Sequence, residues 1–467
     1  MATLFGCSDD VQYTEDSQAR ISFSVDTIAF DTVFTTIGSS TKYLHVYNDN
    51  KKAVRLSSVR LASGGKSGFR VNVDGQYGTT FSDIDILKED SLFVFVEVTV
   101  NPFDSDSPVL VRDSLQFTLA NGHTQQVILQ AYGQDVIILR GETFSVDTTL
   151  DANRPYLIYD SLVVAPNATL NISKGTTLCL HSGASIHVHG RINAAGTVEN
   201  PVIFRGDRTD NMFDYLPYDR LDGQWGGIHI YPESDQNMFD HVDIHSGSYG
   251  ICCDWSTTEN VKVSVYNSEI HNVAGNGIEL NLCSADIVNT QITNAKGNCV
   301  DMTGGAATFL HCTLGQFYPW NSDRGHALQI YNAKNDTIYP LYQCDFYNSI
   351  VTGYADDEIY ASRYSGEYAD SIPFNLHFES CLVNTDTVGA SQYFTNCILD
   401  NNDSTAVRAT QFKLIDTDIY LYNFQLDSLS TARGIANPVY STLYAIDKNG
   451  VTRKTDHPDA GCYEYNF

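Results

Sequence analysis

Two acidic residues have the side chains and the spacing that a catalytic or cation-binding pair needs. Glu279 and Asp301 are 22 residues apart, at equivalent positions of two copies of an internal repeat. If the repeats stack as strands, the two side chains lie about 5 Å apart, close enough to hold Ca²⁺ or to share a proton. The alternative, which we favour, is that both are solvated outward residues. We therefore assign no catalytic residue and no cofactor, and keep this pair and Ca²⁺ as the candidates to test.

Other catalytic and metal-binding signals are sparse. A lyase that acts on uronates needs a Lys or Arg base beside its calcium-binding carboxylates, and the repeats hold few basic residues. His187 and His189, in "HVH", would point the same way on a strand and could bind a metal, but a polar outer face is the simpler interpretation. No Cys-x-x-Cys zinc pattern occurs. The sequence therefore predicts no metal site and favours a protein that is not an enzyme.

Three aromatic segments interrupt the repeats and are the best candidates for binding. They cover residues 208–227, 315–325 and 353–374, and they mix aromatic rings with carboxylates and amides. Such a mixture suits sugar stacking or a protein interface; the alternative is that the segments fold back over the repeats. The candidate binding residues are Tyr215, Tyr218, Tyr318, Trp320, Tyr354 and Tyr360. We expect Trp225, which precedes two glycines and a strand-like run, to lie in the core instead.

The elements that carry these residues repeat with a period of 22. "VYNSEIHNVAGNGIEL" (265–280) aligns without a gap on "IVNTQITNAKGNCVDM" (287–302), so that Ile270 falls on Ile292 and Asn267 on Asn289. Recurring Asn, Gly and β-branched residues at this period indicate stacked coils of short strands. The segment 162–206 resembles the opening of right-handed parallel β-helix proteins, a fold whose enzymes include polysaccharide lyases and hydrolases. We predict this fold for residues 139–412.

Different patterns flank the repeats. Residues 19–138 alternate apolar and polar positions over seven or eight short segments, with Val94, Val96 and Val98 on one face, which predicts an antiparallel β-sandwich. The segment 30–61 resembles abnormal-spindle/hydin-type immunoglobulin-like domains. At the other end, "PDAGCYEY" (458–465) resembles the close of Bacteroidota surface β-helices, and we assign residues 413–467 to a cap on the last coil. The predicted fold class is all-β.

The first 18 residues predict an anchor and a polar tether. "LFGC" (4–7) resembles a bacterial lipobox, which implies lipid on Cys7. Ser8, Asp9 and Asp10 resemble the surface-export signal of Bacteroidota lipoproteins. Asp-Ser and Asp-Thr before an apolar residue or Thr resemble the O-glycosylation acceptor of the same bacteria, although Asp-Ser also starts ordinary turns. The candidate glycosylation sites are Thr27, Thr32, Ser114 and Ser428.

Net charge and cysteine positions limit the classes of function that the chain can have. A net charge of −28 argues against nucleic-acid binding. Most of the 11 cysteines stand in apolar runs, which indicates that they are core residues. We therefore expect a lipid-anchored outer-membrane protein that faces the cell exterior. Its expected role is that of a binding or structural subunit beside an outer-membrane β-barrel protein or other surface lipoproteins. The alternative is a protein that binds or degrades polysaccharide, and glycan stays open as a ligand.

Overall fold

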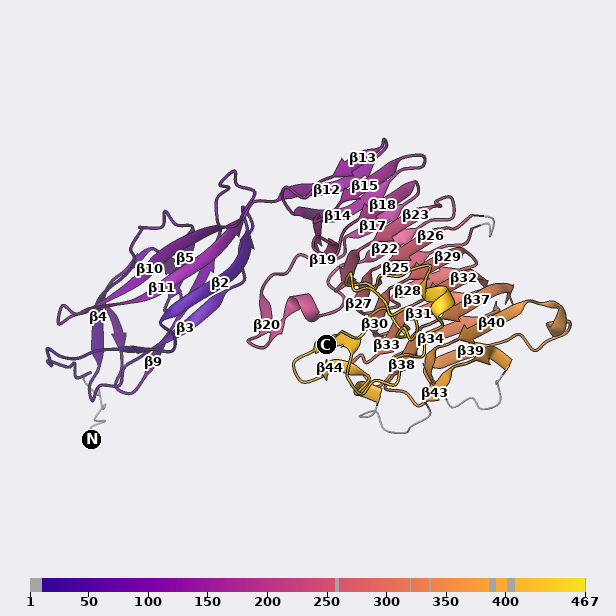
Figure 1. The fold of residues 1–467 in the computed structure, drawn as a ribbon. Coiled ribbons are helices and arrows are strands. Elements are labelled where there is room, and N and C mark those ends of the chain that lie inside the picture. Colours follow the sequence, from indigo (N-terminus) through magenta and orange to yellow (C-terminus); the bar gives the residue numbers. More distant parts are fainter. Residues whose placement is uncertain are drawn as a thin grey trace, which may run out of the picture. The chain divides into compact units, whose positions relative to one another are not determined.

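A computed structural model describes residues 11–256, 260–319, 321–335, 337–385, 392–400 and 408–466 of the 467-residue chain. The chain divides into two compact units, which meet in sequence between Val136 and Ile137. Both units are built from β-strands (Figure 1). The predicted all-β fold class, a sandwich followed by a parallel β-helix, is therefore confirmed.

The N-terminal unit is a β-sandwich whose two sheets enclose an apolar core. Its first sheet has the order β1 (Ser22–Phe23), β3 (Lys42–Tyr47), β9 (Ser91–Val98), β5 (Phe69–Val73), β6 (Gln76–Gly78). Its second sheet has the order β2 (Thr27–Phe34), β11 (Thr124–Gln134), β10 (Val109–Leu119), β4 (Val54–Leu61), β7 (Thr80–Phe81), and β8 (Ile84–Ile86) also pairs with β4. Val94, Val96 and Val98 point into the core, as their alternation predicts. The residues between them consequently face outward.

The second unit is a parallel β-helix with three strands to a coil, and we call the three stacks of strands faces A, B and C. Face A holds β12 (Ile137–Phe144), β14 (Tyr156–Val164), β17 (Ser185–Val188), β22 (Gly227–Ile230), β25 (Ile251–Cys253), β28 (Ile278–Asn281), β31 (Val300–Thr303), β34 (Leu328–Tyr331) and β39 (Ile359–Ser362). Face B holds β16 (Thr177–Leu180), β19 (Val202–Gly206), β24 (Val242–His245), β27 (Glu269–Val273), β30 (Gln291–Ala295), β33 (Thr313–Gln316), β38 (Ile350–Gly353), β41 (Leu382–Asn384) and β43 (Ile398–Asp400). Face C holds β13 (Thr148–Leu150), β15 (Thr169–Ser173), β18 (Arg191–Ala195), β23 (Asn237–Asp240), β26 (Val263–Tyr266), β29 (Ser284–Val288), β32 (Gly305–Leu310), β37 (Leu341–Tyr347), β40 (Phe374–Glu379) and β42 (Phe394–Thr395).

The register between coils is the one that the 22-residue repeat predicts. Ile270 pairs with Ile292, and both side chains are fully buried. The corner that joins face C to face B takes a left-handed conformation, with φ of 51° at Asn267 and 48° at Asn289. Asn tolerates this conformation better than most residues. The Asn289 amide also donates to the Asn267 side-chain oxygen over 3.1 Å, so the repeated asparagines bond between neighbouring coils at this step.

The C-terminal segment runs along the flank of the coils. It contains the hairpin of β44 (Phe412–Asp416) and β45 (Leu421–Leu426) and the short helix α2 (Pro438–Ser441). Arg453 donates to Asn289 over 2.8 Å, Asn348 donates to the Asn437 carbonyl over 3.0 Å, and Tyr463 donates to Gln291 over 2.8 Å. We predicted a cap on the last coil. The described contacts instead lie on the sides of several coils, because the apolar residues of the segment cover an apolar strip beside face B.

Three shorter elements project from the coils. They are the hairpin of β20 (Asn211–Phe213) and β21 (Leu216–Pro217), which leads into the turn η1 (Tyr218–Arg220), the hairpin of β35 (Ala333–Lys334) and β36 (Thr337–Ile338), and the turn η2 (Ala369–Ser371). Cysteines of the described coils are unpaired, and most are buried in the core. No helix among the described residues is long and apolar enough to span a membrane.

Candidate functional site

Face A carries a continuous row of chemically active side chains on its outer surface. Each member is paired in register with the next across neighbouring coils. The row, which we call the outward row, consists of His187, His229, Cys252, Glu279, Asp301, Gln329 and Tyr360. Because parallel strands are about 4.8 Å apart, adjacent members are close enough to act on one ligand.

The predicted carboxylate pair lies in the middle of this row. Glu279 and Asp301 are register partners on β28 and β31, which confirms that they share one track. Glu279 accepts hydrogen bonds from Asn276 and Asn281, each over 3.0 Å. Asp301 is 6% exposed, so our favoured picture of two solvated residues is wrong for this carboxyl.

Burial alters the acidity of Asp301. Loss of water raises the pKa of Asp301 above its usual range, and the negative charge of Glu279 raises it further. Hydrogen bonds from Gln329 over 2.7 Å and Asn298 over 2.9 Å oppose this rise. Asp301 therefore keeps its proton to a higher pH than an exposed aspartate does, although the positive charge of Lys334 also opposes the rise of its pKa.

The first aromatic segment is held in shape by contacts among its own residues. Arg208 stacks on the Tyr218 ring at 3.8 Å and pairs with Asp210, while Tyr215 remains exposed and stacks on Phe213 at 5.7 Å. Of the two tyrosines predicted here, Tyr215 therefore presents an open ring and Tyr218 is half-buried.

A buried charge network holds the end of this segment. His245 contacts Asp243 through Nδ1 over 2.8 Å and Asp219 of η1 through Nε2 over 2.9 Å. An imidazole whose two nitrogens both face carboxylates donates from both, and so carries a positive charge. Burial by itself lowers the pKa of His245, but the charge of Asp243 and the hydrogen bond to Asp219 raise it to about 10. Arg205 and His271 complete the network on Asp219 and Asp243.

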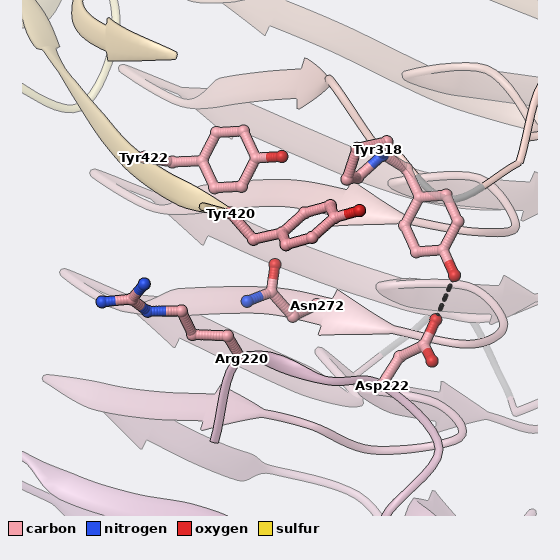
Figure 2. Close-up of a pocket in the computed structure, with 7 residues that line it drawn as sticks. Arg220, Asp222, Asn272, Tyr318, Tyr420 and Tyr422 are labelled. Atoms are coloured by element: carbon pink, nitrogen blue, oxygen red, sulfur yellow. Dashed lines mark hydrogen bonds between the residues drawn. The ribbon is translucent and has the colours of Figure 1, made fainter. Parts of the chain in front are cut away.

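The second aromatic segment closes a small pocket against the C-terminal hairpin. Tyr318 points toward Asp222 and hydrogen-bonds its carboxylate, while Tyr420 and Tyr422 line the opposite side (Figure 2). Tyr318 is 6% exposed, because the C-terminal segment packs over the coil at this point. We predicted Tyr318 as a binding residue; in the structure it is a packing residue that ties two insertions to the hairpin. Trp320, predicted beside it, lies outside the described residues.

The third aromatic segment separates into a buried part and an open part. Tyr354 packs edge-on against Phe317 at 5.0 Å and is half-buried. Tyr360 is exposed on β39 and stacks on His326 at 5.7 Å. Tyr360 is therefore accessible, and it also ends the outward row. Trp225, predicted to be core, is buried and donates to the His245 carbonyl.

An exposed aromatic face, which sequence analysis missed, covers the outer surface of the first sandwich sheet. It consists of Tyr43, Tyr47, Phe93 and Phe95, with His45 between them. Tyr43 is 58% exposed and Phe93 46%, and their ring centroids are 6.0 Å apart. The Arg70–Glu97 ion pair lies on neighbouring strands of the same sheet. The alternation that placed the valines of β9 inward also places Phe93 and Phe95 outward, so the signal was present in the sequence.

The remaining predicted sites divide between described and undescribed residues. Cys7, Ser8, Asp9 and Asp10 lie outside the described residues. Among the candidate glycosylation sites, Thr27, Thr32 and Ser114 are half-buried in strands, whereas Ser428 is exposed in a turn after Asp427. Ser428 is consequently the most accessible of these four acceptors.

Comparison with known proteins assigns part of the β-helix. Residues 141–261 match the family model described as a pectate-lyase like beta helix domain. No curated protein matches the chain. One similar solved structure is the ASH/PapD-like domain 7 of human CEP192, with 11% identity and a TM-score of 0.18; the match covers 29% of this chain and 95% of that domain. Another is a family 123 glycoside hydrolase from Clostridium perfringens, with 7% identity and a TM-score of 0.18, covering 24% of this chain and 26% of that one. The chain thus carries a β-sandwich followed by a pectate-lyase-like parallel β-helix.

Proposed function

We propose that this protein is a non-catalytic, surface-exposed outer-membrane lipoprotein that serves as a binding subunit of an outer-membrane protein complex. The observation that carries the proposal is the exposed aromatic face of the sandwich. Tyr43, Phe93 and Phe95 contact one another, and His45 links Tyr47 to them. Together they form an exposed apolar patch of the kind that marks a protein interface. Lipid on Cys7 would keep this patch close to partners in the same membrane.

The chemistry of the face favours a protein over a glycan. Phe93 and Phe95 offer no hydrogen-bonding group, whereas sugar recognition combines ring stacking with polar contacts to hydroxyls. An aromatic centre beside the charged pair Arg70–Glu97 matches the usual arrangement of a protein interface, an apolar core with a polar rim. Aromatic side chains are also the residues that most often dominate binding energy.

Co-purification tests the proposal. Full-length protein is extracted from native membranes in mild detergent, as wild type and as the double variant Tyr43→Ser, Phe93→Ser. We expect the wild type to co-purify with an outer-membrane protein, identified by mass spectrometry, and the double variant to lose it. The control is Tyr132→Ser, because Tyr132 is 45% exposed on β11 of the other sheet of the sandwich and should be dispensable. A wild-type protein that runs alone, or a double variant that keeps its partner, contradicts the proposal.

A second candidate function rests on the outward row. A pair of adjacent carboxylates, one of them buried, on a pectate-lyase-like β-helix favours binding or cleavage of polysaccharide. The test is an absorbance assay for unsaturated uronate products, run on a panel of polyuronates with and without Ca²⁺. Activity lost in Glu279→Gln and Asp301→Asn, but kept in Asp286→Asn on face C, would establish this second function. Absence of turnover and of binding in the wild type would exclude it.

A further inference from the structure

We infer that the N-terminal half of the outward row is a binding site for a divalent transition-metal ion, with Zn²⁺ as the best match. The ligands are His229, Cys252 and Asp254. Each offers one donor atom, and these donor atoms lie within 4.8 Å of one another. The inference goes beyond the proposed function and does not depend on it.

The fold itself brings the three donors together. His229 on β22 and Cys252 on β25 are register partners on adjacent coils, and both point outward. Asp254 follows Cys252 by two residues, so it leaves the coil on the same side. The Nε2 atom of His229 already contacts the Asp254 carboxylate over 2.9 Å. The cluster is hidden in the sequence, because His229 and Cys252 are 23 positions apart.

The rings around the site are held in place. His229 stacks on Tyr231 with 4.2 Å between ring centroids and 15° between ring planes. The hydroxyl of Tyr231 lies 3.1 Å from Nδ1 of His187, the register partner of His229 on the preceding coil. A preorganised imidazole loses little freedom when it binds a metal, and such outer partners of a ligand commonly strengthen the site.

The donor set selects the ion. A thiolate, an imidazole and a carboxylate together suit Zn²⁺, whereas Ca²⁺ takes oxygen ligands. In a tetrahedral zinc site, nitrogen and oxygen donors are about 3.4 Å apart, so the contact between His229 and Asp254 must widen by about 0.5 Å. On binding, the Cys252 thiol releases its proton to solvent and the sulfur–zinc bond forms. The proton that Nε2 of His229 shares with Asp254 must move to Nδ1, because the zinc–nitrogen bond uses the Nε2 lone pair. A fourth position remains for water, and Glu279 is the register partner of Cys252 on the next coil.

A second cluster of histidines and an aspartate in the β-helix differs from this site in its ability to bind a metal. Asp243, His245 and His271 also bring their donor atoms together. However, both nitrogens of His245 already donate to carboxylates, so this histidine has no lone pair to offer a metal. The two clusters therefore differ in kind: the first can bind an ion, and the second is a charge network that fixes an insertion.

The test measures zinc binding on the full chain after removal of metal with a chelator. Zn²⁺ is titrated in competition with a chromogenic chelator, and Co²⁺ is titrated separately to detect the thiolate-to-cobalt absorption band. We expect the wild type to compete for one equivalent of Zn²⁺ and to show the band. Cys252→Ser should abolish the band, and both Cys252→Ser and His229→Gln should weaken zinc binding by about 10-fold or more. Matched controls are Cys397→Ser and His181→Gln, which remove a half-buried thiol and a histidine of another His–Asp pair.

Alkylation of Cys252 gives an independent measurement. Zn²⁺ should protect this thiol from iodoacetamide, as read by mass spectrometry of its peptide, and an excess of Ca²⁺ should not. The inference is overturned if the wild type does not compete for zinc, if the control variants lose zinc as the site variants do, or if Ca²⁺ protects Cys252 equally. The melting temperatures of all variants show whether any loss of zinc binding comes from unfolding.

Discussion

The charge on His245 makes a quantitative prediction about stability and pH. The folded protein holds the imidazole between Asp219 and Asp243 with a pKa of about 10, while the unfolded chain releases the proton near the ordinary value of 6.5. Below pH 6.5 both states carry the proton, and the stabilisation is fully present. As pH rises toward 10 the folded state binds a proton that the unfolded state lacks, and the stabilisation is progressively lost.

The magnitude follows from the two pKa values. Between pH 7 and pH 8 this one group should lower the free energy of unfolding by about 1.2 kcal/mol. The variant His245→Asn lacks the group, so its unfolding free energy should change less over the same interval. The variant should also be less stable at pH 7, because Asp219 and Asp243 lose a buried counter-charge.

The assay uses tryptophan fluorescence during urea unfolding. All three tryptophans of the chain belong to the β-helical unit, so their signal reports on that unit. The wild type, His245→Asn and the control His181→Asn, whose side chain is 49% exposed, are compared at pH 7.0, 7.5 and 8.0. If the wild type and His245→Asn lose the same free energy between pH 7 and pH 8, His245 is not charged in the folded protein and the reasoning is refuted.

Three further predictions follow from the fold and the anchor. Ile292→Asp should destabilise the β-helix by several kcal/mol, because it places an unpaired charge at a fully buried position. Ile292→Val should cost about 1 kcal/mol. If Ile292→Asp and the wild type have the same melting temperature, the register is refuted. Arg453→Met should cost about 2 kcal/mol, because it removes buried hydrogen bonds to Asn289 and to the Gly461 carbonyl, while Glu464 keeps its ion pair with Lys454. Limited proteolysis should then cut the C-terminal segment first; an unchanged digestion pattern would count against the role of this arginine. Cys7→Ala should move the protein from the membrane fraction to the soluble fraction, and continued membrane association would show that the anchor is elsewhere.

Contacts between neighbouring repeats could be predicted from the sequence, whereas contacts between segments far apart in the chain could not. The stacking of Ile270 on Ile292 was predictable, because a gapless repeat fixes both the period and the inward face. The burial of Tyr318 was not, because it results from a C-terminal segment about 100 residues further along the chain. His229 and Cys252 were missed for a related reason. Their coils differ in length from the 22-residue repeat, so their register became visible only in the folded chain.

The C-terminal segment changes how the coils should respond to force. A solenoid is close to one-dimensional, and its units can unravel from an end one after another. In this protein Lys448 pairs with Glu269, and the Gly461 amide donates to the Asn348 carbonyl several coils further on, so one later segment of the chain binds these coils together. Pulled from its N-terminal end, the β-helix should give small successive steps until the coil of Glu269, and then one larger rupture as the strapped coils open together. Deletion of residues 445–467 should turn that rupture into further small steps.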